Sequence, residues 1–163
     1  MSNKSPMTTY GYEKLQEEVR RLKLEERPKC AKAIGIAREH GDLSENAEYD
    51  AAKEAQGMVE GRIRDIESKL ATAQVVDVSK LSGEKVVFGA TVTISDVDTG
   101  DEKQVMIVGE DETDSEKGRI SYESPIARAL IGKNIDDIVK VKLPAGAKEY
   151  EILEVEFAPI EGD

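Results

Sequence analysis

Tryptophan is absent from this sequence of 163 residues, which also contains only one cysteine, one histidine and two phenylalanines. With Cys30 alone, no disulfide can form within the chain, and the alanines and isoleucine that follow it favour a packed position on a helix in a reducing compartment. The sequence lacks a run of eighteen apolar residues, and its first ten residues lack the apolar segment of a secretory signal. We therefore expect a soluble, cytoplasmic protein that has no membrane partner.

An excess of positive charge is also missing, because 23 basic residues face 34 acidic ones and give a net charge of −11. Proteins that bind nucleic acid in general draw affinity from Lys and Arg, so the composition argues against that class. The charge is unevenly distributed: residues 1–77 hold 13 basic and 15 acidic residues, whereas residues 78–163 hold 10 and 19. The first half is therefore nearly neutral, whereas the second half is strongly acidic.

Apolar residues at helical spacing follow the first part of the chain. The stripe that begins at Leu15 continues to Ala37 and predicts one long helix, which Pro28 should bend near Arg27. A second stripe with heptad-like spacing comes after Gly41, at Ala52, Ala55, Val59, Ile63, Ile66, Leu70 and Ala73. A connection this short brings two helices back antiparallel, so we expect each helix to cover the apolar face of the other.

The hydrophobic period changes near Asp77, where runs of β-branched residues begin to alternate with turns. The expected strands lie in VVFGATVTISDV, KQVMIVGE, RISYES, IVKVKL and YEILEVEFA, and SPIARALIG predicts one short helix with a serine cap. We therefore predict an α+β protein. Residues 1–77 form an N-terminal antiparallel α-helical coiled-coil hairpin with an acidic tip, and residues 78–163 form a small α+β domain.

Four acidic residues lie at the predicted bend of the hairpin: Asp42, Glu45, Glu48 and Asp50. One interpretation is structural, because Asp42 as a helix cap and Glu45 three residues later would form a capping box. The other is metal binding, since Mg²⁺ prefers oxygen ligands and often uses one or two carboxylates. Two-metal phosphoryl chemistry needs ligands for a second ion, which this sequence does not offer. The pair would then be half of a site that another protein completes.

The segments AREHGDLSENAEYDAAKEAQ, GRIRDIESKL, FGATV and SPIARALIG carry a resemblance that covers nearly the whole chain. They resemble the Gre family of bacterial transcript cleavage factors. The resemblance implies a coiled coil that enters the secondary channel of RNA polymerase and an FKBP-like C-terminal domain that docks on the channel rim. It also implies a cofactor, rather than an enzyme, that activates the polymerase's own cleavage of backtracked nascent RNA.

The same resemblance assigns roles to particular residues. Asp42 and Glu45 match the catalytic tip acids, which hold a Mg²⁺ jointly with the polymerase and bind none tightly alone. Arg38 and Lys53 match a basic patch toward the RNA 3′ end. Polymerase docking is assigned to Glu123, Ser124 and Pro125, although some relatives have Asp in place of Glu123. We expect a monomer whose partners are RNA polymerase and the nascent RNA within that complex.

Two other classes of function remain as alternatives. One is an enzyme that acts alone, either a nuclease at the tip or a prolyl isomerase in the second half, which has few aromatic residues to line a pocket. The other is an interaction module that occupies the polymerase channel and regulates or inhibits the polymerase without stimulating cleavage. In that module the tip acids would serve only as caps.

Overall fold

The computed structural model describes residues 4–41 and 46–161, and these fall into two compact units. One unit is helical and spans residues 13–72, and the other combines residues up to 12 with residues 73 onward. Asp42 and Glu45 lie outside the described residues. In the part of the chain that is described, no helix is both long enough and apolar enough to cross a membrane.

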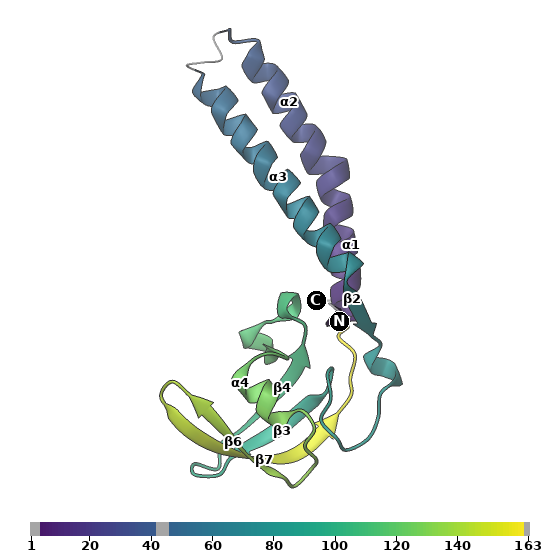
Figure 1. Ribbon diagram of the computed structural model, residues 1–163, viewed down its shortest axis with the longest axis vertical. Coiled ribbons are helices and arrows are strands. Elements are labelled where there is room, and N and C mark those ends of the chain that lie inside the picture. The colour runs from purple at the N-terminus through teal and green to yellow at the C-terminus, as the bar shows by residue number, and fades with distance from the viewer. Residues whose placement is uncertain (1–3, 42–45, 162–163) are drawn as a thin grey trace. The chain divides into compact units, whose positions relative to one another are not determined.

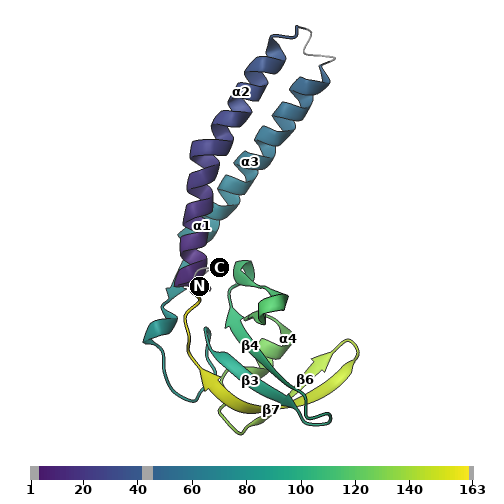
Figure 2. The ribbon, with the colours of Figure 1, turned by 180° about the vertical axis from the view of Figure 1, so that it is seen from behind.

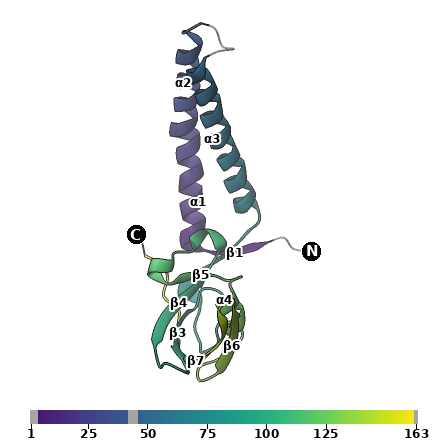
Figure 3. The same cartoon turned by 90° about the vertical axis from the view of Figure 1, so that its left-hand side faces the viewer.

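The helical unit is a hairpin built from α1 (Thr9–Arg21), a π-helical turn (Leu22–Glu26), α2 (Arg27–Arg38) and α3 (Ala47–Ala71). The first three elements follow one another along one side of the hairpin, and α3 returns beside them (Figure 3). Residues of the predicted apolar stripes form the contact between the two sides, with Leu15, Leu22, Cys30, Ile34, Ala37, Ile63 and Ile66 buried. In the second stripe Ala55 is exposed, and Ala73 lies beyond the helix in the strand Ala73–Val76. The predicted helical hairpin is therefore confirmed.

Pro28 is accommodated by a change in helical hydrogen bonding. A proline inside a helix donates no N–H, and its ring crowds the carbonyl four residues earlier. In the structure the chain widens into the π-helical turn Leu22–Glu26 just before Pro28, and the Arg27 N–H donates to the carbonyl of Leu22, five residues back. The sequence predicted a bend near Arg27; the structure shows a π-helical turn there, which lets the helical path continue past the proline.

Among the described residues, three ion pairs of Lys or Arg with Glu join the two sides of the hairpin. Glu18 pairs with Arg62, Lys23 with Glu67 and Arg27 with Glu60, at N–O distances of 2.7, 2.8 and 2.8 Å. Pairs this exposed contribute little free energy singly, typically less than about 1 kcal/mol. Because each pair joins one residue before the bend to one after it, together they favour a single register of the helices.

The second unit is built on a curled five-stranded sheet, in the order β5-β4-β3-β7-β6 (Figure 2). Its strands are β3 (Thr91–Asp96), β4 (Glu102–Val108), β5 (Arg119–Ser121), β6 (Ile138–Leu143) and β7 (Gly146–Glu156). Only the β4–β5 pair within this sheet is parallel. The helix α4 (Pro125–Leu130) adds Ala127 and Leu130 to a continuous core that also contains Val92, Ile107 and Ile152. The predicted α+β fold class is therefore confirmed.

Two short strands escaped the sequence prediction. β1 (Ser5–Thr8) pairs in parallel with β2 (Ala73–Val76), which follows α3 directly (Figure 1). As a result, the chain on both sides of the helical unit belongs to the sheet unit. The compact units divide at residues 12/13 and 72/73. The change in hydrophobic period predicts a boundary at 77/78 instead. Short 3-10 turns at Val78–Lys80, Glu110–Glu112 and Ser115–Lys117 complete the unit.

Candidate functional sites on the hairpin and the sheet unit

Asn46, the N-cap of α3, forms hydrogen bonds to both helices of the hairpin. The Asn46 side chain accepts a hydrogen bond from the Tyr49 N–H at 3.0 Å and donates one to the carbonyl of Ala37 at 2.7 Å. One amide therefore begins α3 and joins it to the last turn of α2. The hypothesis that Asp42 caps this helix is wrong, because α3 begins at Ala47 and its cap is Asn46.

The other acidic residues of the bend lie in the first turn of α3, where carboxylates suit the positive end of the helix dipole. Glu48 pairs with His40, with 3.3 Å between Nε2 and Oε2. His40 is exposed, and this contact joins a residue that follows α2 closely to the first turn of α3. Asp50 is exposed. Glu48 and Asp50 therefore have a structural explanation as acids in the first turn of a helix.

Arg38 and Lys53 lie on the two helices that flank the bend. Arg38 is the last residue of α2 and Lys53 lies in the second turn of α3, and both are exposed. The Lys53 ammonium donates to the Gln56 side chain at 3.2 Å, within the same helix. Each cation is thus accessible to an anion near the bend.

Within the described residues, no group of three or more His, Cys, Asp or Glu side chains is placed to hold a metal ion. The two predicted ligands, Asp42 and Glu45, both lie outside that part of the chain. Two carboxylates have the chemistry of a partial Mg²⁺ shell, and the remaining positions would require water, phosphate or another protein.

The segment predicted to dock on a partner has a defined local structure. The Ser124 side chain accepts from the Ala127 N–H at 3.3 Å and caps α4, which begins at Pro125. The Glu123 N–H donates to the Ser121 hydroxyl at 3.1 Å. Ser124 and Pro125 thus have the structural role that the sequence predicted, and the segment that contains them is fixed at both ends.

The Glu123 carboxylate is part of a hydrogen-bonded group. Hydrogen bonds from the side chains of Glu110 and Tyr122 hold the pKa of Glu123 below its ordinary value, with Glu110 contributing most. Burial is the main cause of the raised pKa of Tyr122, and its hydrogen bond to Glu123 adds to it. The Tyr122 ring packs edge-on against Phe88, with 5.9 Å between centroids. Glu123 is therefore a fixed negative charge on the surface of the sheet unit.

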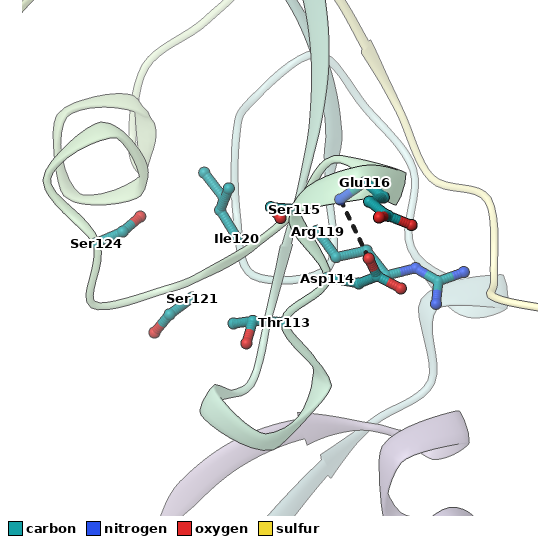
Figure 4. A pocket seen from close by; sticks show the side chains of 8 residues that line it. All are labelled: Thr113, Asp114, Ser115, Glu116, Arg119, Ile120, Ser121 and Ser124. Atoms are coloured by element: carbon teal, nitrogen blue, oxygen red, sulfur yellow. Dashed lines mark hydrogen bonds between the residues drawn. The ribbon is translucent and has the colours of Figure 1, made fainter.

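A shallow hollow lies beside this segment (Figure 4). Ser124, Ser121 and Ile120 line the side near α4, and the guanidinium of Arg119 lies on the opposite side. The lining also contains Thr113, Asp114, Ser115 and Glu116. Several of these polar groups already have partners: Asp114 accepts from the Glu116 N–H, and Ser121 and Ser124 accept from the backbone. The polar groups around the hollow are hydroxyls, carboxylates and the Arg119 guanidinium, and its eight lining residues include no imidazole or thiol.

Two family models match the chain, one at each end. "Transcription elongation factor, N-terminal" matches residues 5–75, and "Transcription elongation factor, GreA/GreB, C-term" matches residues 81–157. The chain therefore belongs to the GreA/GreB family of transcription elongation factors, as the resemblance of its sequence motifs indicated.

Two relatives named GreA agree with this assignment. The chain is 58% identical over 157 residues to transcription elongation factor GreA of Trichlorobacter lovleyi, covering 96% of this chain and 99% of that protein. It is 60% identical over 154 residues to GreA of Phenylobacterium zucineum, covering 94% and 98%. Among solved structures, GreA factor homolog 1 (Gfh1) of Thermus thermophilus matches at 26% identity over 94% of this chain and 99% of that one, with a TM-score of 0.44.

Proposed function

We propose that this transcription elongation factor inserts its hairpin into the secondary channel of RNA polymerase and stimulates the polymerase's own cleavage of backtracked nascent RNA. Membership of the GreA/GreB family supports action on RNA polymerase, which in bacteria is a cytoplasmic enzyme. In this role the chain is a cofactor of the polymerase and not itself an enzyme. The hairpin supplies a narrow helical probe with a bend fixed by Asn46.

The proposal gives the tip acids, Asp42 and Glu45, the role of binding a metal ion. The observation that supports it is the capping of α3 by Asn46, so that Asp42 is not the N-cap of this helix. We assign both carboxylates to a Mg²⁺ shared with the polymerase, which supplies the other ligands. Such an ion lowers the pKa of a bound water and stabilises the charge that develops on an attacked phosphodiester. The chain's own residues only hold the ion.

Other residues complete the proposed complex. Arg38 and Lys53 are exposed beside the bend, where they can neutralise phosphates at the RNA 3′ end. Glu123, Ser124 and Pro125 dock the sheet unit on the channel rim, with the fixed charge of Glu123 as the polar contact. The factor acts as a monomer.

The test is cleavage in purified polymerase complexes that are stalled and backtracked. We expect the wild-type chain to shorten the RNA, and Asp42→Asn or Glu45→Gln to reduce the rate at least 100-fold while still competing for polymerase. Asp50→Asn is the matched control, since it removes one exposed carboxylate from the first turn of α3, and it should cleave within twofold of wild type. Normal cleavage by Asp42→Asn would contradict the metal assignment.

The same experiment separates the alternatives. Wild-type protein that binds the polymerase and leaves the RNA intact would indicate a channel-occupying regulator. Magnesium-dependent RNA cleavage by the purified chain without polymerase would indicate an independent nuclease.

A further inference from the structure

Both sides of the hairpin contain residues that weaken a helix, and these residues lie part of the way along it. On the first side, the π-helical turn Leu22–Glu26 is followed by Pro28, which donates no backbone hydrogen bond. On the other side, α3 contains Gly57 and Gly61 in its interior, and glycine is the least favourable helical residue after proline. Sharp changes of direction in helices are found at prolines, at π-helical turns and at pairs of glycine or serine.

An ion pair places these features opposite one another within the helical unit. The Arg27 guanidinium donates two hydrogen bonds to the Glu60 carboxylate, at 2.8 and 2.9 Å. Pro28 follows Arg27 in the chain, and Gly61 follows Glu60. The proline of one side and a glycine of the other therefore lie at nearly the same level of the hairpin. Gly57 lies about one turn further toward the bend.

Packing does not explain the two glycines of α3. A Cβ atom added to Gly57 would have no other atom within 4 Å, and one added to Gly61 would lie 3.8 Å from the Arg64 guanidinium, an ordinary contact distance. Neither glycine has a positive φ. An alanine would therefore fit at both positions and favour the helix more strongly.

The apolar seam between the two sides is thin at this level. On the first side, Leu22 and Cys30 are buried, and the seven residues between them are exposed or half-buried. On the other side, Ile63 and Ile66 are buried, whereas none of the described residues 47–62 is. Segments with few buried apolar contacts change conformation at low free-energy cost. Little apolar packing therefore resists a change of direction here.

We propose that the hairpin contains a hinge at this level, formed by the π-helical turn and Pro28 on one side and by Gly57 and Gly61 on the other. Because the two sides pack along each other, the hairpin flexes only where both sides yield, and at this level both do. The helical turns between the hinge and the bend then tilt relative to those before the hinge. The use of this motion rests on the proposed function: it lets the end of the hairpin adjust its direction within a confined channel.

Residual dipolar couplings of the free protein in a weakly aligning medium measure this tilt. Amide couplings from residues 48–55 and 62–70 report the alignment of the two parts of α3 separately. A swing of about 20°, the size of a sharp helix kink, lowers the alignment of one part by roughly 10% relative to the other. We expect this difference in wild type, and we expect the double variant Gly57→Ala/Gly61→Ala to remove it.

Gly35→Ala is the matched control, because Gly35 lies in α2 with no atom within 4 Å of the added carbon. It makes the same substitution in a helix interior outside the hinge and should leave the difference between the two parts of α3 unchanged. Pro28→Ala acts on the hinge from the first side by restoring a backbone N–H, and it should reduce the difference. Equal alignment of the two parts in wild type, or an unchanged difference in the double variant, would overturn the proposal.

The cleavage assay tests the use of the hinge separately. We expect the double variant to raise the half-saturating concentration of the factor about threefold, because stiffening lowers the fraction of molecules that have the shape required for insertion. Gly35→Ala should leave that concentration unchanged, and an unchanged value in the double variant would contradict the use of the hinge in insertion. Wild-type protein that does not stimulate cleavage would contradict the proposed function alone, since the couplings are measured without polymerase.

Discussion

The two units of this chain are stabilised by different means. The sheet unit has a continuous core of thirteen buried residues drawn from the sheet, α4 and the intervening loops. The helical unit has one narrow seam, of which Ile63 and Ile66 are the buried residues of α3, and a set of exposed ion pairs. The comparison shows that the hairpin is ordered largely by local pairing along its length. Substitutions in it should therefore have smaller and more local effects than substitutions in the sheet unit.

The largest expected difference comes from truncating one isoleucine in each unit. Ile107→Ala should destabilise the sheet unit by about 4 kcal/mol, since this fully buried side chain is enclosed by a core that cannot collapse around the cavity. Ile66→Ala removes an equally buried side chain, but the half-exposed helix surfaces beside it can close the gap, so about 2 kcal/mol is expected.

Hydrogen exchange in urea measures both costs, because it reports the opening of each unit separately. Equal costs for the two isoleucines would show that the seam of the hairpin is packed as rigidly as the core of the sheet.

A pair of glycine substitutions should have effects of opposite sign in the two units. Gly118 has a φ of +73°, and a Cβ there would lie 2.6 Å from the backbone oxygen of Gln104. Gly118→Ala should therefore destabilise the sheet unit by about 2 kcal/mol or more. Gly57 lies inside α3 with nothing near the added carbon, so Gly57→Ala should stabilise the hairpin by up to about 1 kcal/mol. Thermal unfolding checks both signs.

The sequence predicted the elements whose burial is periodic. The helical stripe that begins at Leu15 and the alternating strands β3 and β6 bury most of the residues that their spacing selects. The stripe of α3 is weaker, since only its Ile63 and Ile66 are buried. It did not predict the β1–β2 pair, because four residues such as Ser5–Thr8 carry no alternation and their partners lie far along the chain. Parallel pairing of such short strands depends on tertiary contacts that local sequence does not encode.

The candidate sites also differ in whether a local sequence signal predicts them. Ser124 and Pro125 begin α4 as predicted, since a cap and a first-turn proline are local signals. One of the two interpretations of the acidic tip made Asp42 the cap of α3, whereas the cap is Asn46. Asp and Asn are equally good caps, so propensity cannot choose between two candidates four residues apart. The sequence did not predict the hydrogen bond from the Thr8 N–H to Glu112, because the two residues lie 104 positions apart and no local pattern joins them.

The smallest expected effect concerns the Glu18–Arg62 pair, which tests the contribution of ion pairs to the hairpin. Two hydrogen bonds, at 2.7 and 2.8 Å, join the carboxylate to the guanidinium. The side-chain hydrogen bond from Arg62 is the main cause of a Glu18 pKa below its ordinary value of 4.5, while burial opposes it. A carboxylate with a lowered pKa contributes stability that is present above pH 4.5 and is lost as the pH falls through the lowered pKa.

Because both side chains are about one-third exposed, solvent screens the pair, and Glu18→Gln should cost less than about 1 kcal/mol at neutral pH. The difference in melting temperature between wild type and Glu18→Gln should shrink as the pH is lowered from 6 to 3, since protonation removes the same charge. Glu13→Gln, an exposed acid on the same helix, is the control and should show no such convergence. A difference that stays constant with pH would mean that the pair stabilises the hairpin through the packing of its side-chain carbons rather than through its charge.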